Sequence, residues 1–167
     1  MECMQVELCF TGEGDDTSPK VVSLRGLDNA LYYRPNALLN LAQPPVPTLV
    51  RDALGFWSKN HSLDGFVLLS AEAIAQGVDG TVLDTPQLAQ VLATDGALRG
   101  CKIVAWPRDY GLLPRNGRRG FPHAGALLQH NGAFGAVLQW LGGGGPGLLT
   151  SVATQLTGVL CWCPAAP

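Results

Sequence analysis

The chain is poor in charged residues and contains no long apolar run, and both absences narrow what it can be. Charged residues make up 14% of its 167 positions and hydrophobic residues 47%, a composition that excludes an intrinsically disordered chain. The formal net charge of −2 provides no general attraction for nucleic acid or anionic lipid, so we expect neither as a partner. No stretch reaches the roughly 18 consecutive apolar residues of a membrane span. The first residues lack the pattern of a signal peptide, so we expect no targeting peptide within this chain.

The cysteine pattern fits neither a disulfide framework nor a metal centre. The five cysteines are Cys3, Cys9, Cys101, Cys161 and Cys163. An odd number disfavours the paired disulfides of a secreted domain and favours a reducing compartment. Cys161 and Cys163 would need two further ligands at tetrahedral spacing, and none of the three histidines belongs to such a pattern. We therefore expect no metal site, and we expect no cofactor.

Glycine and proline are abundant, at 21 and 12 residues, and they separate short apolar segments. Strands are expected at residues 6–10, 65–69 and 101–106. Helices are expected at residues 48–61, 86–95, 133–141 and 148–156. Thr48 is the expected N-cap of the first helix, and Pro86 is expected at the first helical position of the second. Residues 11–47 and 107–132 are expected to form irregular loops, and residues 142–147 a Gly-rich break.

The alternation of strands and helices indicates a parallel α/β sheet or barrel. The length suits one domain with a substantial core. It supplies only about three βα units, however, whereas a closed (β/α)8 barrel needs about 250 residues. The expected fold class is therefore α/β, a partial TIM (β/α)8 barrel, with residues 1–167 forming the central part of the barrel domain.

One expected strand has the form of an active-site strand without its chemistry. Residues 64–69 (DGFVLL) read as a turn followed by a buried parallel strand. A barrel enzyme places a catalytic group at the carboxyl end of such a strand. Here that end carries Leu69 and Ser70, and the first carboxylate is Glu72.

Several segments carry a family resemblance in one register. Residues 22–33 (VSLRGLDNALYY) match the family stretch V-S-x-R-G-x-D-N-x-x-Y-Y. Further matches lie at residues 45–46, 54–57, 62–66, 86–88, 95–105, 121–123, 131–132 and 156–158. On these motifs the chain resembles the isoamylase-type starch or glycogen debranching enzymes, which belong to the α-amylase superfamily and glycoside hydrolase family 13. Within that family it resembles the non-catalytic isoamylase subunit of plants and algae.

The resemblance implies that the catalytic positions are substituted. Retaining members of the family need a carboxylate nucleophile and a carboxylic acid about 5 Å apart. Carried over position by position, the nucleophile falls on Leu69, its neighbouring arginine on Val67 and the acid/base on Trp106. An Asn-His pair that contacts substrate falls on Cys9 and Phe10. The third catalytic carboxylate of the family would lie after the last residue of this chain, so the resemblance implies no catalytic residue here.

Candidates for glucan binding also follow from the resemblance. They are Arg25, Asp28, Asn29, Tyr32, Tyr33 and His123. A tyrosine offers a sugar ring an apolar face and a hydroxyl group. The alternative is a loop held by Arg25 and Asp28 with its tyrosines packed against the barrel rim. Trp106 is either a sugar-stacking platform or a plug that fills the former catalytic space, and we favour the plug.

The expected function is that of a catalytically silent isoamylase-like protein of starch or α-glucan metabolism. It would act in glucan binding, or as a regulatory or scaffold subunit of an isoamylase complex. Its expected partners are an α-glucan and an active isoamylase subunit, and the resemblance implies a plastid location. Two alternatives stay open. Rearranged carboxylates, such as Glu72 or Asp109, would retain hydrolysis of α-1,6 branch links, or the chain would be a truncated fragment without function.

Overall fold

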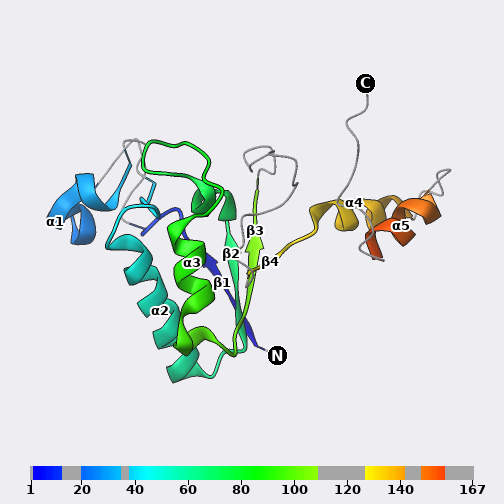
Figure 1. Ribbon diagram of the computed structural model, residues 1–167, viewed down its shortest axis with the longest axis horizontal. Coiled ribbons are helices and arrows are strands. Elements are labelled where there is room, and N and C mark those ends of the chain that lie inside the picture. The colour runs from blue at the N-terminus through cyan, green and yellow to red at the C-terminus, as the bar shows by residue number, and fades with distance from the viewer. Residues whose placement is uncertain (1, 13–19, 35–37, 109–126, 142–147, 157–167) are drawn as a thin grey trace.

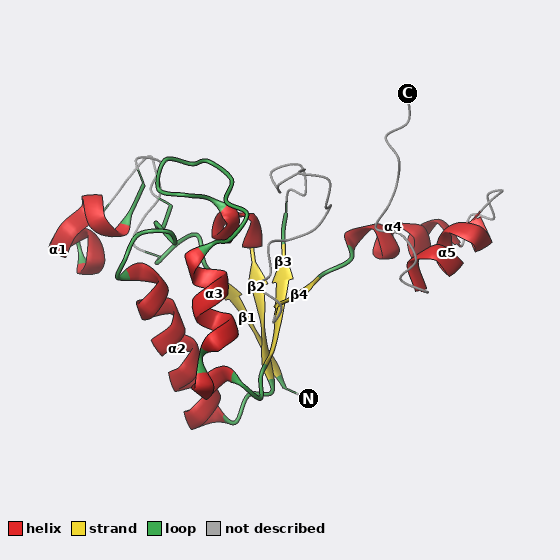
Figure 2. Cartoon of the chain, viewed as in Figure 1, coloured by secondary structure: helices red, strands yellow, loops and turns green. Residues whose placement is uncertain are grey.

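The computed structural model describes residues 2–12, 20–34, 38–108, 127–141 and 148–156. Figure 2 shows that helices, strands and loops alternate along this part of the chain. Within the described residues, no helix combines the length and apolar character needed to cross a membrane.

The centre of the fold is a parallel sheet. Its strands are β1 (Cys3–Glu7), β2 (Gly65–Leu69), β3 (Lys102–Trp106) and β4 (Leu127–Gln129). They lie in the order β1-β2-β3-β4, and each pairs in parallel with the next. Strands that are consecutive in sequence are therefore neighbours in space, as in one sector of a (β/α) barrel. The expected α/β class with a parallel sheet is confirmed, whereas closure into a barrel stays a prediction.

Helices follow the strands. They are α1 (Ser23–Tyr32), α2 (Val46–His61), α3 (Gln87–Thr94), α4 (Gly132–Leu141) and α5 (Leu148–Leu156), with short 3-10 helices η1 (Ala71–Ala75) and η2 (Gly96–Leu98). Helices α2 and α3 lie side by side next to the sheet, while α4 and α5 pack on each other beyond β4 (Figure 1).

The core lies between the sheet and helices α2 and α3. From the sheet it takes alternate residues, chiefly Phe66, Leu68 and Ile103, which are 0–4% exposed. The helices contribute the buried residues Val46, Val50, Leu54, Leu88, Ala89 and Leu92. Because successive side chains of a strand point to opposite faces, this burial assigns the even-numbered residues of β2 to the helix side.

The opposite face of the sheet is much less covered. The register aligns Gln5, Val67, Val104 and Leu128 in one row across the four strands. Val67 and Val104 are half-buried, Gln5 is exposed and Leu128 is 55% exposed. The three apolar residues of this row, Val67, Val104 and Leu128, form a surface on which a further protein element can pack.

The positions of the strands differ in two ways from the sequence-based expectation. Strand β1 is Cys3–Glu7 rather than residues 6–10, because β2 ends at Leu69, opposite Glu7. Leu8 and Cys9 lie beyond the end of β1 but are nevertheless buried. Their apolar side chains therefore reflect packing in the core and do not show that these residues belong to the strand. Strand β4 was not expected, and it lies within residues 107–132, where we expected an irregular loop.

The helix positions also require corrections. Residues 11–47 are not irregular throughout, since they contain α1. This helix has a kink at Asp28, with φ −157° and ψ 92°, and it includes Gly26, a residue of low helix propensity. Helix α2 begins at Val46 with Pro45 as N-cap, so the expectation that Thr48 is the N-cap is wrong.

The start of α3 also differs from the expectation. Pro86 is its N-cap and therefore lies one residue before the first helical position, where we expected it. The expected Gly-rich break at residues 142–147 lies outside the described residues.

Gly65 provides a test of the β2–β3 contact. A Cβ atom at this position would overlap the backbone oxygen of Lys102 and lie 3.2 Å from its carbonyl carbon, so β3 must shift to admit it. We expect Gly65→Ala to lower the free energy of unfolding by about 1–3 kcal/mol, the usual effect of overpacking. Urea denaturation followed by circular dichroism measures this change.

The matched control is Gly96→Ala in η2, where an added Cβ would meet no atom within 4 Å. We expect this variant to remain within about 0.5 kcal/mol of the unsubstituted protein. Equal unfolding midpoints for the two variants would contradict the close approach of the strands.

Candidate functional site at the carboxyl ends of the strands

The register brings three side chains into a row at the carboxyl ends of the strands. Glu7 pairs with Leu69, and Leu69 pairs with Trp106. Neighbouring strands are about 4.8 Å apart, and residues paired in a parallel sheet point to the same face. Val67 lies on that same face of β2, two residues before Leu69. Thus the positions that the resemblance assigns to the nucleophile, arginine and acid/base do lie close together, and they carry apolar side chains.

Trp106 does not fill this space as a buried plug. Its side chain is 38% exposed, and its ring stacks on His130 with a centroid separation of 4.1 Å and an interplanar angle of 12°. His130 is held beside it because its backbone N–H donates to the carbonyl oxygen of Ala105, at 2.8 Å. Phe10 is 49% exposed and does not close the site either. The plug interpretation is therefore wrong, and an accessible aromatic pair lies at the strand ends.

Glu7 is a functional candidate that the sequence analysis missed. One carboxylate oxygen accepts a hydrogen bond from the Ser70 hydroxyl at 3.0 Å, and the same oxygen lies 3.0 Å from Nη2 of Arg108. The other oxygen accepts from the backbone N–H of Cys9 at 3.1 Å. The alternation of side chains along β1 would have identified Glu7, provided that the strand had been expected to end at this residue.

Arg108 links this carboxylate to a second one. Its backbone N–H donates to Glu72 at 2.9 Å, while its guanidinium pairs with Glu7. Glu72 therefore lies at the same edge of the sheet as Leu69, even though it follows that strand by three residues. Both carboxylates are occupied in these contacts. Asp109, the other carboxylate considered from the sequence, lies outside the described residues.

Cys9 lies beneath this cluster. It is 6% exposed, and its thiol donates to the carbonyl oxygen of Ser70 at 3.8 Å. Burial, with a further contribution from the negative charge of Glu7, raises the pKa of the Cys9 thiol to about 12. Cys9 thus remains a neutral thiol at physiological pH, which makes it a packing residue and a poor nucleophile.

Two arginines anchor the segment that follows β1. Arg34 donates to the side-chain oxygen of Gln76 at 2.5 Å and to its carbonyl oxygen at 3.0 Å, and burial lowers the pKa of Arg34. The Arg25 guanidinium lies 4.3 Å from the centroid of the Tyr33 ring, and the Tyr33 hydroxyl contacts the Thr11 hydroxyl. These contacts fix the segment between α1 and the strand ends.

The candidate glucan-binding residues therefore differ in accessibility. Tyr33 and Arg25 are 3% and 9% exposed, so their side chains hold the segment together more than they present a surface. Asp28 and Asn29 are exposed, and Tyr32 is half-buried. The Asp28 carboxylate accepts from the backbone N–H of Leu31 at 3.0 Å, close to the kink of α1. The remaining candidate, His123, lies outside the described residues.

In the described part of the chain, no group of three or more His, Cys, Asp or Glu side chains is arranged to hold a metal ion.

Comparisons with known proteins follow the resemblance seen in the motifs. Isoamylase 3, chloroplastic, of Oryza sativa subsp. japonica is 35% identical over 162 residues, covering 89% of this chain and 20% of the rice protein. Isoamylase 2, chloroplastic, of Arabidopsis thaliana is 31% identical over 163 residues, covering 92% of this chain and 18% of that protein. The glycogen debranching enzyme of Pectobacterium atrosepticum is 30% identical over 108 residues, covering 58% of this chain and 16% of that enzyme.

The chain thus spans about a fifth of the length of the curated relatives it matches. No protein-family model matches it. The similarity nevertheless extends through about nine tenths of the chain and is shared with several isoamylases. On this similarity, the chain belongs to the isoamylase-type family, in glycoside hydrolase family 13.

Proposed function

We propose that this chain is a catalytically silent isoamylase-type protein that binds α-glucan and acts as a regulatory or scaffold subunit of an isoamylase complex. The observation that carries the proposal is the row Glu7–Leu69–Trp106, in which β2 and β3 end in hydrocarbon and indole groups. Hydrolysis with retention needs a carboxylate that forms a covalent bond to the sugar and an acid that protonates the leaving oxygen. Neither Leu69 nor Trp106 has a group that can take either role.

The two carboxylates that remain at this edge are poorly suited to replace them. Glu7 is paired with Arg108 and accepts a hydrogen bond from Ser70, and Glu72 accepts the backbone N–H of Arg108. These contacts engage both carboxylates, whereas a nucleophile or a general acid must reach the glycosidic bond. This arrangement supports the silent assignment.

The exposed stack of Trp106 and His130 is the proposed glucan contact. A sugar ring presents an apolar face of C–H groups to an aromatic ring and hydroxyl groups around its edge. The Arg108 guanidinium, whose side chain is 68% exposed, and the Glu7 carboxylate provide polar groups at the same edge of the sheet. Asp28, Asn29 and His123 remain proposed contacts of the same glucan.

The less covered face of the sheet is the proposed contact with a partner. Val67, Val104 and Leu128 form an apolar row there, and β1 and β4 are the edge strands of the sheet. Apolar rows of this kind are typical of protein interfaces. We propose an active isoamylase as the partner and, because the plant relatives are named as chloroplastic proteins, a plastid as the location.

The absence of hydrolysis is the first prediction. Purified protein incubated with amylopectin should release no reducing ends above a blank, because the row at the strand ends lacks a nucleophile. A chloroplast isoamylase that hydrolyses amylopectin serves as the positive control. Sustained release of reducing ends by the unsubstituted chain would contradict the silent assignment.

The contacts of Glu7 and Glu72 with Arg108 define the second candidate function, hydrolysis through rearranged carboxylates. If reducing ends are released, this candidate requires that Glu7→Gln or Glu72→Gln abolish the activity. Each substitution keeps the size of the side chain but replaces the carboxyl group with an amide, which is no nucleophile. Activity that survives Glu7→Gln and also Glu72→Gln would exclude both carboxylates.

Trp106 should carry much of the glucan affinity. We expect Trp106→Ala to weaken binding of maltoheptaose roughly 2- to 12-fold, because a favourable aromatic contact is worth about 0.5–1.5 kcal/mol. Trp106→Phe, which keeps an aromatic face, should retain most of the affinity. A titration followed through the amide signals of Ser70 and Arg108 by nuclear magnetic resonance measures binding at this site. Equal affinities for Trp106→Ala and the unsubstituted chain would contradict the proposal that the Trp106–His130 stack contacts the glucan.

Leu128 tests the partner surface. Because Leu128 is 55% exposed on the less covered face, Leu128→Glu should leave the core intact and abolish co-elution with an active isoamylase in size-exclusion chromatography. The control is Val82→Glu, a substitution at a 43% exposed residue outside the four strands of the sheet. Failure of the unsubstituted chain to co-elute, or co-elution of the Leu128→Glu variant, would contradict the proposed interface.

A further inference from the structure

A pocket of about 330 Å³ lies between α2 and η2. Its lining comes from α2, between Arg51 and Asn60, and from Asp95 and Ala97 at η2. Helix α2 ends just before β2 begins, and η2 ends just before β3 begins. The C-terminal part of α2 and η2 therefore lie at the amino ends of these strands, the end of the sheet opposite to Leu69 and Trp106. Among the residues we assigned to glucan binding or catalysis, none lines this pocket.

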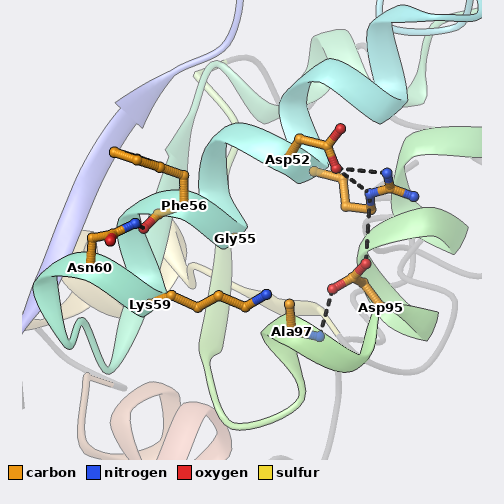
Figure 3. A pocket seen from close by; sticks show the side chains of 8 residues that line it. Asp52, Gly55, Phe56, Lys59, Asn60, Asp95 and Ala97 are labelled. Carbon is orange, nitrogen blue, oxygen red and sulfur yellow. Dashed lines mark hydrogen bonds and ion pairs between the residues drawn. The ribbon is translucent and has the colours of Figure 1, made fainter.

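One side of the pocket is held by ion pairs and hydrogen bonds. Nη2 of Arg51 lies 2.6 Å from the Asp52 carboxylate, and Nε of Arg51 lies 3.6 Å from the Asp95 carboxylate. Asp95 also accepts the backbone N–H of Ala97 at 2.7 Å, which fixes η2 against it. In Figure 3 these groups gather on one side, and the Lys59 side chain extends across the pocket toward Ala97.

Phe56 and Asn60 lie on the other side of the pocket in Figure 3. Phe56 is 57% exposed, a large accessible surface for an aromatic ring. The Asn60 amide nitrogen donates to the carbonyl oxygen of Phe56 at 2.8 Å, which leaves its side-chain oxygen to accept a further hydrogen bond. Between the two sides lies Gly55, whose lack of a side chain leaves the surface of the helix open. A Cβ there would lie 3.8 Å from the Cβ of Ala97.

The charges of the lining indicate what the pocket can hold. Arg51 and Lys59 balance Asp52 and Asp95, so the lining carries no net charge at neutral pH and favours neither an anion nor a cation. Among the described residues, no ion pair involves Lys59, so its ammonium has donors available. An accessible aromatic ring beside unused donors and acceptors suits a neutral polyhydroxylated ligand.

We propose that the α2–η2 pocket is a second binding site for a neutral oligosaccharide, separate from the strand ends. The choice of an α-glucan as the ligand rests on the proposed function. The site binds without chemistry, because both carboxylates of the lining are paired with Arg51. Two sites at opposite ends of the sheet allow one chain to contact two parts of a branched glucan, or two glucan molecules.

The test uses the isotopically labelled chain and maltoheptaose, with amide signals resolved for each site. We expect shifts of Gly55, Lys59 and Ala97, in addition to those of Ser70 and Arg108. Phe56→Ala should weaken binding at the α2–η2 pocket about fivefold or more and leave the strand-end signals unchanged. Leu49→Ala is the control, since Leu49 is 41% exposed on the same helix but does not line the pocket.

The outcomes separate this inference from the proposed function. Shifts at Ser70 and Arg108 alone would overturn the second site and leave the strand-end proposal standing. Shifts at Gly55, Lys59 and Ala97 alone would support the second site and remove the strand-end contact. Binding at the pocket that Phe56→Ala and Leu49→Ala weaken equally, or the absence of any shift, would overturn the second site.

Discussion

The parallel register of β1, β2 and β3 is the constraint on which the rest of the structure depends. It is stabilised from one side, where Phe66, Leu68 and Ile103 are buried against α2 and α3. Because the side chains of a strand alternate, burial of these residues directs Val67 and Leu69 to the opposite face, together with their neighbours in the sheet. A shift of one residue would expose the core residues, so the hydrophobic packing also determines which side chains meet at the strand ends.

At the strand ends, the Glu7 carboxylate and the groups around it form a cluster of hydrogen bonds and one ion pair. The Glu7 carboxylate is surrounded by the Ser70 hydroxyl, the Cys9 N–H and the Arg108 guanidinium. With the Arg108 side chain 68% exposed, this ion pair is worth at most about 1 kcal/mol to stability, so its importance lies in where it holds the two side chains. The cluster positions Arg108 and Glu72 at the edge of the sheet, and under the proposed function it supplies neither the acid nor the nucleophile of hydrolysis.

The sequence predicts the elements that have strong local signals and misses those that depend on distant partners. The turn Asp64-Gly65 followed by an apolar run predicts β2 correctly, and the helical spacing from Leu49 to Trp57 predicts α2. Helix α1 was missed although Leu24, Leu27 and Leu31 have helical spacing, because the segment is short and contains Gly26, a weak helix former.

In the candidate site, too, some features follow from the sequence and others depend on distant partners. The resemblance brings the positions of Leu69 and Trp106 together correctly, since strand order follows from the family. It did not identify Glu7, because the end of β1 is set by pairing with β2 and not by its own apolar residues. The exposure of Trp106 was also unexpected, because its partner His130 follows β4, a strand of three residues with little signal of its own. Local sequence contains no information on a contact of that kind.

The central claim is that no group at the strand ends can form a covalent bond to a sugar. The most direct measurement is intact-mass spectrometry after incubation with an activated fluoro-maltosyl fluoride, which traps the glycosyl intermediate of retaining enzymes. We predict that the mass of the chain stays unchanged while that of a hydrolytic isoamylase increases by one glycosyl unit. A glycosyl adduct on this chain, located on Glu7 or Glu72 by peptide mapping, would contradict the account.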